Sequence, residues 1–175
     1  MTDSPPFIFI TGFMCAGKST VGAALARLLE TSFLDLDQFV SEREGRSVPL
    51  IINESGEEHF RLVETKALDE LLTRRLARVV ALGGGTWTIR RNRVLIRERG
   101  GLTVWLDTPF ELCWERISRS ADERPLARDR EAALRLFHAR RALYEEADLR
   151  VQVNEEKSTD ETVAEIARLL SQSGA

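Results

Sequence analysis

The chain contains, at residues 12–19, the stretch Gly-Phe-Met-Cys-Ala-Gly-Lys-Ser (GFMCAGKS). This stretch satisfies the pattern G-x-x-x-x-G-K-[S/T], in which successive backbone amides surround phosphate oxygens. The motif has the context that it requires, because residues 7–11 form a short apolar run typical of a buried strand and residues 19–30 have helical periodicity. The alternative is a chance glycine turn, but the strand before it and the helix after it favour a phosphate-binding loop (P-loop).

Within this loop, Lys18 is expected to reach the β- and γ-phosphates of ATP, and the hydroxyl of Ser19 is expected to ligate Mg²⁺. Cys15 would lie at a helix N-terminus near Lys18, a setting that favours a thiolate; the alternative is a tolerated small side chain. The residues of this segment that we expect to bind ATP are Gly12, Cys15, Ala16, Gly17, Lys18, Ser19 and Thr20.

The rest of the chain alternates between short apolar runs and helical patterns. Strands are predicted at residues 33–36, 78–82, 102–106 and 149–153, and helices at 57–75, 110–118, 131–146 and 159–170. Such alternation predicts an α/β fold in three layers (α/β/α), with a five-stranded parallel sheet covered on both faces. With no repeats and no low-complexity linker, residues 1–175 are expected to form a single domain.

Composition excludes several classes of function. The chain of 175 residues is 43% hydrophobic and 30% charged, with a net charge of −3, whereas nucleic-acid binders usually carry a basic excess. No apolar run approaches the roughly 18 residues of a membrane span, and the first residues lack the order of a signal peptide. The two cysteines follow no metal or disulfide spacing. We therefore expect a cytoplasmic protein with no nucleic-acid or membrane partner. We also expect it to be a monomer.

An acidic pair follows the second predicted strand. Asp35 and Asp37 flank one leucine at the edge of a parallel sheet where ligands bind. In a strand-like arrangement both carboxylates would face the same side, one serving a metal and the other orienting or deprotonating an attacking hydroxyl. The alternative role for Asp37 is the N-cap of a following helix.

Three further segments carry candidate site residues. Arg61 and Glu64 are three apart on a predicted helix, so they can pair and present the guanidinium to a carboxylate; a surface salt bridge is the alternative. Gly83, Gly84 and Gly85 end the third strand, either exposing amides to a ligand or forming a plain flexible turn. Residues 119–130 are nearly all polar, which is typical of a mobile loop.

Taken together, these segments resemble the shikimate kinase family over nearly the whole chain. The matching pieces are GFMCAGKST at 12–20, DLD at 35–37, GEEHFRLVE at 56–64, GGG at 83–85, RPL at 124–126 and RRALYEE at 140–146. The resemblance implies a nucleoside-monophosphate-kinase-like P-loop kinase domain with a helical substrate-binding segment at 35–64 and a mobile lid at 119–130. It also implies an enzyme of aromatic amino-acid (chorismate) biosynthesis that uses ATP and Mg²⁺ to phosphorylate the 3-hydroxyl of shikimate.

The resemblance also implies residue roles. Asp35 would serve the Mg²⁺ side with Ser19, and Asp37 would hold shikimate hydroxyls and assist the transferred proton. Arg61 and Arg140 would clamp the shikimate carboxylate, with Gly83, Gly84 and Gly85 touching the same ligand. Arg124 in the lid would stabilise charge in the transition state, and Arg119 would stack on adenine. The residues given catalytic roles are Lys18, Asp37 and Arg124.

The chain departs from the family pattern at Cys15, Ile52, Ala127 and Ala142, where the family has Gly, Phe, Leu and Pro. None of these changes removes a charged group, but they leave the acceptor preference open. A kinase for gluconate, another small hydroxylated acid or a nucleoside monophosphate is one alternative. A catalytically silent nucleotide-binding relative is another, although Lys18, Asp37, Arg61 and Arg124 are all present.

Overall fold

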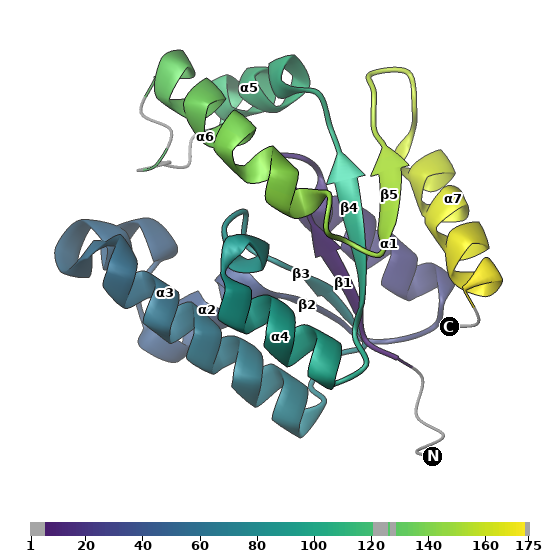
Figure 1. The fold of residues 1–175 in the computed structure, drawn as a ribbon, viewed down its shortest axis with the longest axis horizontal. Coiled ribbons are helices and arrows are strands. Elements are labelled where there is room, and N and C mark those ends of the chain that lie inside the picture. Colours follow the sequence, from purple (N-terminus) through teal and green to yellow (C-terminus); the bar gives the residue numbers. More distant parts are fainter. Residues whose placement is uncertain (1–5, 121–125, 127–128, 174–175) are drawn as a thin grey trace.

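The computed structural model describes residues 6–120, 126 and 129–173 of the chain (Figure 1). One sheet contains five parallel strands in the order β2-β3-β1-β4-β5. Their bounds are Ile8–Thr11 (β1), Phe33–Asp35 (β2), Val79–Ala81 (β3), Leu102–Asp107 (β4) and Leu149–Gln152 (β5). The predicted five-stranded parallel sheet is thus confirmed. Because β1 is central and the strand order reverses beside it, the loop that follows β1 lies at the usual ligand-binding position.

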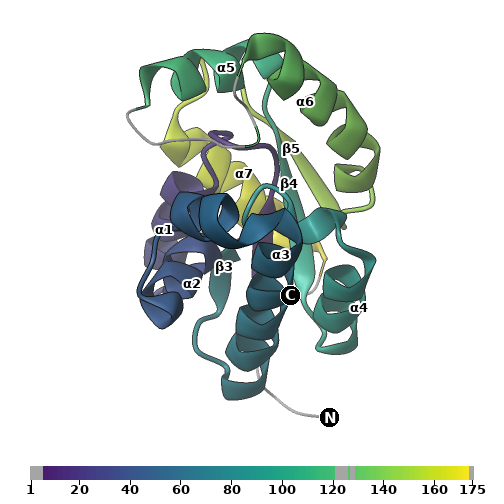
Figure 2. The ribbon, with the colours of Figure 1, turned by 90° about the vertical axis from the view of Figure 1, so that its left-hand side faces the viewer.

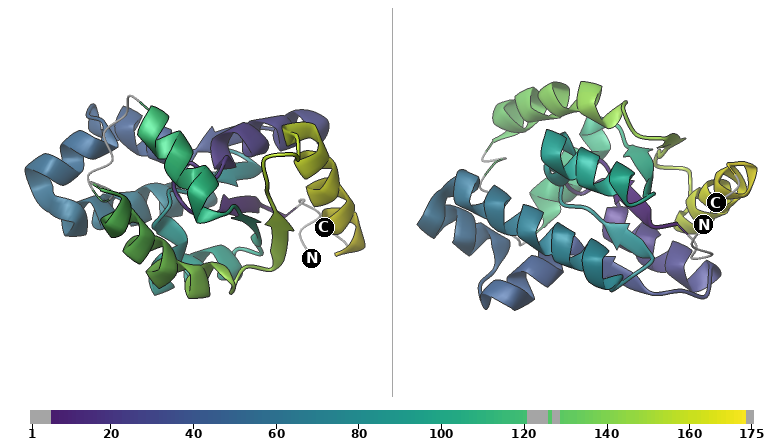
Figure 3. Two further views of the ribbon diagram at one scale, coloured as in Figure 1. Left: turned by 90° about the horizontal axis from the view of Figure 1, so that it is seen from above. Right: turned by 60° about the horizontal axis from the view of Figure 1, so that its bottom comes forward.

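Helices cover both faces of this sheet. In the part of the chain described, they are Lys18–Leu28 (α1), Leu36–Glu44 (α2), Val48–Arg74 (α3), Arg90–Glu98 (α4), Phe110–Arg119 (α5), Arg130–Tyr144 (α6) and Thr159–Gln172 (α7), with a 3₁₀ turn at Thr86–Thr88 (η1). The yellow α7 lies beside the purple α1 (Figure 3). No helix among these is long and apolar enough to cross a membrane.

Side-chain alternation along the central strands divides the core into two clusters. Ile8 and Ile10 of β1 pack with α1 and α7, whereas Phe9 packs with the cluster that includes α3, α5 and α6. This two-residue period is the one expected of a strand buried on both faces. In Figure 2, α5 and α6 lie at the top of the molecule, across from α2 and α3.

The segment between β2 and β3 differs from the prediction. The second strand ends at Asp35, and α2 begins immediately with Leu36, so Asp35 and Asp37 are not in a strand-like arrangement. Asp35 caps α2, because its carboxylate accepts hydrogen bonds from the backbone of Asp37 and Gln38. The alternative of Asp37 as N-cap is therefore also wrong.

Besides α2, two helical regions were not predicted from the sequence. The helix predicted at 57–75 is the second part of α3, which begins at Val48 and is interrupted at Gly56 by non-helical angles (φ 86°, ψ 161°). Helix α4 was missed because it buries polar side chains instead of an apolar stripe. Its Asn92 donates to the Thr86 carbonyl, and its Arg93 donates to the carbonyls of Trp87 and Thr88. These bonds anchor η1, which leads out of the three-glycine turn.

Candidate active site

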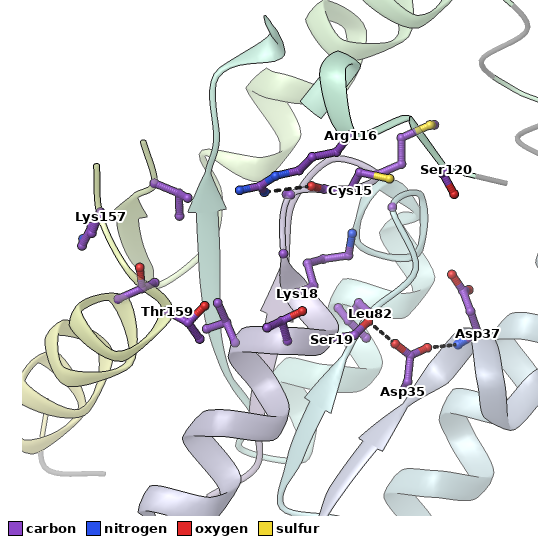
Figure 4. A pocket seen from close by; sticks show the side chains of 18 residues that line it. Cys15, Lys18, Ser19, Asp35, Asp37, Leu82, Arg116, Ser120, Lys157 and Thr159 are labelled. Atoms are coloured by element: carbon purple, nitrogen blue, oxygen red, sulfur yellow. Dashed lines mark hydrogen bonds between the residues drawn. The ribbon is translucent and has the colours of Figure 1, made fainter. Parts of the chain in front are cut away.

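A cavity of about 440 Å³ opens at the carboxyl end of the central strands (Figure 4). The P-loop forms one wall, and the start of α2 and the turn after β3 form another. On the remaining side lie α5 and the connection from β5 to α7. Among the residues that line it are Lys18, Ser19, Asp35, Asp37, Gly84 and Arg116.

The P-loop wraps tightly from β1 into α1. Gly12 (φ 145°) and Gly17 (φ 102°) have left-handed backbone angles, and a Cβ on Gly12 would lie only 2.8 Å from the carbonyl oxygen of Leu106. The first amides of α1 have no partner within the helix, so they can bind an anion in the cavity. The loop therefore has the geometry of a phosphate-binding site.

Lys18 lies inside this wrap. Its Nζ donates to the Phe13 carbonyl oxygen at 2.8 Å, and burial lowers the pKa of the ammonium group against the raising influence of Asp37. Cys15 has a positive φ of 58°, a conformation that costs a non-glycine residue about 1 kcal/mol. This finding gives a physical reason why the family pattern has glycine there. The Cys15 carbonyl accepts a hydrogen bond from the Arg116 guanidinium at 3.1 Å.

The two acids have separate environments. Asp35 accepts a hydrogen bond from the Ser19 hydroxyl through one oxygen and caps α2 through the other. Asp37 is half-buried in the first turn of α2 and points into the cavity (Figure 4). Burial, followed by the nearby charges of Glu64 and Asp35, raises the pKa of Asp37 from 3.8 to about 6. A carboxyl with such a pKa is suited to exchange a proton near neutral pH.

A divalent cation fits the Ser19–Asp35 contact, because the hydroxyl and the carboxylate are both hard oxygen donors. Over the described residues, no group of three or more His, Cys, Asp or Glu side chains could hold a metal. A magnesium ion of the kind held by one or two protein oxygens together with nucleotide phosphates matches this donor set.

The three-glycine turn after β3 makes room for side chains from different elements. A Cβ on Gly83 would lie 2.6 Å from Asp37 Oδ1, and a Cβ on Gly85 would lie 2.3 Å from Arg61 Nη2. A Cβ on Gly84 would lie 3.4 Å from Arg140 Nη1 and 3.3 Å from the backbone nitrogen of Met14 in the P-loop. The turn is thus closely packed, and it brings Asp37, Arg61 and Arg140 together beside the P-loop.

Arg61 and Glu64 form an ion pair below the protein surface. Glu64 is fully buried and only 18% of the Arg61 side chain is exposed, so the surface-bridge alternative is wrong. Arg61 Nη1 lies 2.9 Å from Glu64 Oε2, and the Thr86 hydroxyl donates to the other Glu64 oxygen at 2.5 Å. Burial alone would lower the pKa of Arg61, but the adjacent Glu64 and Glu57 carboxylates raise it above its ordinary value.

Arg140 is a buried cation, with an exposed fraction of only 7%. The Tyr144 hydroxyl lies beside the Arg140 guanidinium and donates to the Gly84 carbonyl at 2.5 Å. Burial lowers the pKa of Arg140, and within the described part of the chain it forms no ion pair. A buried cation without a paired carboxylate favours an anionic ligand at this position.

The structure does not place either predicted lid arginine, Arg119 or Arg124, on the cavity wall. Arg124 and most of the 119–130 segment lie outside the described residues. The Arg119 side chain is 78% exposed and pairs with Glu115 at 2.7 Å, away from the cavity. Arg116, one turn earlier on α5, lines the cavity instead and was missed. The signal available for it was helical spacing, because Arg116 follows the buried Cys113 by three residues.

The cavity wall formed by the connection between β5 and α7 was also missed. Lys157, Thr159 and Thr162 line it, and the Lys157 ammonium donates to the Gln152 carbonyl at 2.9 Å. Ser158 and Glu161 form a reciprocal capping box that starts α7 at this point. The pattern S-x-x-E agrees with the helix predicted from residue 159, but it gave no sign that this helix start borders the cavity.

Known proteins resemble the chain along almost its full length. The model of the family described as "Shikimate kinase" matches residues 14–171. The shikimate kinase of Aquifex aeolicus is 40% identical over 167 residues, covering 95% of this chain and 96% of that protein. That of Geobacter sulfurreducens is 44% identical over 163 residues, covering 91% and 88%. The solved shikimate kinase from Acinetobacter baumannii in complex with shikimate superposes with a TM-score of 0.89 at 35% identity, covering 98% and 96% of the two chains.

Proposed function

The chain belongs to the shikimate kinase family, and on that premise we propose how its residues transfer a phosphoryl group from ATP to the 3-hydroxyl of shikimate. The observation that carries the proposal is the three-glycine turn, around which Asp37, Arg61 and Arg140 meet within reach of the P-loop. A phosphate-binding loop and a site for a hydroxylated carboxylic acid therefore lie side by side. Direct transfer between two bound substrates requires this arrangement.

On the nucleotide side, the P-loop amides bind the phosphates, and Lys18 exchanges the Phe13 carbonyl for phosphate oxygens. Its burial strengthens its interaction with the charge that develops on the transferred group. Arg116 takes the adenine contact that the resemblance assigned to Arg119, because its guanidinium lies on the cavity wall and against the P-loop. Arg124 stays a prediction for the lid, as do the cytoplasmic location and the monomeric state.

On the acceptor side, Arg61 and Arg140 bind the shikimate carboxylate from two elements. Arg140 is positioned by the Tyr144 hydroxyl, and Arg61 by the buried Glu64. This grip leaves the ring hydroxyls toward Asp37, which orients the 3-hydroxyl and accepts its proton. With a pKa of about 6, the Asp37 carboxylate is mostly ionised at neutral pH and still basic enough for that task.

Ser19 and Asp35 would hold magnesium, Asp35 through the ion's water shell. The ion would neutralise charge on the β- and γ-phosphates when it is bound with ATP. The Asp35 oxygen that caps α2 also fixes the first turn in which Asp37 lies, so this residue links the metal side to the acceptor side.

A coupled assay of ADP release tests the proposal with shikimate, gluconate and nucleoside monophosphates as acceptors. We expect turnover with shikimate alone, and a loss of at least about 10²-fold in Lys18→Ala. Turnover with gluconate or a nucleoside monophosphate and not with shikimate would assign another acceptor. Tight ATP binding without turnover of any acceptor would favour a silent relative.

A further inference from the structure

Two carboxylates of unlike environment hold the Arg61 guanidinium. Glu64 is fully buried and tied to Thr86, so it is a fixed partner on the Nη1 side. Glu57 is 46% exposed and takes the opposite edge, with its Oε1 at 3.3 Å from Nε and 3.0 Å from Nη2. The Nε–Nη2 edge of Arg61, one of the two edges that can form a bidentate contact with a ligand carboxylate, is therefore already occupied by a side chain of the protein.

Glu57 is placed where it can leave this contact at little structural cost. It directly follows Gly56, at which non-helical angles divide α3. A Cβ on Gly56 would meet no atom within 4 Å, so this bend is not packed against other parts of the described structure. By contrast, Phe60, one turn further on, is buried in the core and holds the rest of the helix in place.

The charge of Glu57 reaches the second arginine as well. Burial has the largest effect on the pKa of Arg140, followed by the hydroxyl of Tyr144 and the repelling charge of Arg61. The next largest effect comes from the carboxylate of Glu57, which raises this pKa. Glu57 is thus near both cations to which the proposed function assigns the acceptor carboxylate. Its negative charge stands in for the charge that a bound acid would bring.

We propose that Glu57 is an internal competitor of the acceptor, which the carboxylate of shikimate displaces from Arg61 while Glu64 stays in place. This inference rests on the proposed function. Small anions that contact Arg61 alone gain little by displacing Glu57, whereas an acid that also reaches Arg140 gains a second cation. Glu57 therefore sets a threshold that favours acids able to bridge both arginines.

Calorimetric titration of shikimate into the nucleotide-free protein tests the inference. In Glu57→Gln the dissociation constant of shikimate should fall about two- to fivefold, the range expected for removing a partly exposed ion pair. Glu58→Gln is the matched control, because Glu58 is the exposed neighbour and its change alters the net charge equally. A second removal, Glu57→Ala, should show the same gain, and unchanged ADP affinity verifies that each variant is folded.

The methyl ester of shikimate supplies a second readout, because it lacks the negative charge needed to displace Glu57. Its affinity should gain less from Glu57→Gln than that of shikimate does. If Glu57 merely positioned Arg61, Glu57→Gln would bind shikimate more weakly or equally well. Either result would overturn the inference. An equal gain in Glu58→Gln would also overturn it. The proposed function fails by a different result, namely that the unaltered protein neither binds nor phosphorylates shikimate, and the inference would fail with it.

Discussion

Replacing Asp37 with asparagine should make the protein more stable and, at the same time, nearly inactive. The Asp37 carboxyl is half-buried beside Glu64 and Asp35, and its pKa rises from 3.8 to about 6 on folding. The folded state therefore opposes ionisation of this group. Asparagine keeps the shape but carries no charge, so it removes this cost together with the base.

The pH dependence follows from the direction of this pKa shift. Because the folded protein binds the Asp37 proton more tightly than the unfolded chain does, the carboxyl stabilises the fold only while it is protonated. That contribution is fully present below pH 3.8 and is lost as the pH rises through about 6. The unfolding free energy of Asp37→Asn should thus exceed that of the unaltered protein by about 1.5 kcal/mol at pH 5 and by up to about 3 kcal/mol at pH 8.

Urea unfolding at the two pH values, in EDTA and without nucleotide, measures this difference. Asp69→Asn is the control, because Asp69 makes only a 3.9 Å surface contact with Arg99 and should show a small, pH-independent change. The shikimate-dependent kcat of Asp37→Asn should fall by about 10²- to 10⁴-fold. An Asp37→Asn protein that is less stable than the unaltered one, or whose advantage does not grow with pH, would refute the reasoning.

Three further changes test the site geometry. Gly85→Ala would place a Cβ 2.3 Å from Arg61 Nη2, so shikimate binding should weaken by about 1–3 kcal/mol with ADP affinity kept; a normal KM for shikimate would contradict the packing. Arg116→Ala should lower ADP affinity by about 0.5–2 kcal/mol in calorimetry, whereas Arg119→Ala should leave it nearly unchanged. The opposite result would assign the adenine contact to Arg119. Tyr144→Phe removes the hydroxyl that lies beside Arg140 and bonds to the Gly84 carbonyl, so the KM for shikimate should rise by the equivalent of about 1–3 kcal/mol while the KM for ATP stays unchanged. Equal effects on both substrates would indicate a general structural role.

Much of the fold could be predicted from the sequence because its buried strands are short, apolar and separated by amphipathic helices. All five predicted strands exist, and no strand end is shifted by more than one residue. The missed helices include α2 and α4, neither of which has a continuous apolar stripe. Helix α4 is fixed by hydrogen bonds from Asn92 and Arg93, which depend on tertiary neighbours that no local pattern reveals.

The site was predictable where a motif carries its own geometry and unpredictable where partners come from afar. The P-loop needs only its glycines and the adjoining strand and helix. The spacing between Arg61 and Glu64 could not exclude a surface pair, because it says nothing of the burial that Thr86 and Gly85 impose. Choosing between Arg116 and Arg119 required knowing which side of α5 faces the cavity, and the lid sequence around them could not decide it.

The close packing at the three-glycine turn has a consequence for how this protein folds. Asp37, Arg61 and Arg140 reach that turn from α2, α3 and α6, so the acceptor grip is complete only when distant parts of the chain have docked. Contacts between such widely separated residues form late, because long loops must close first. During refolding, kinase activity should therefore recover later than the helical circular-dichroism signal. Partly folded molecules should be inactive and should not phosphorylate other acceptors.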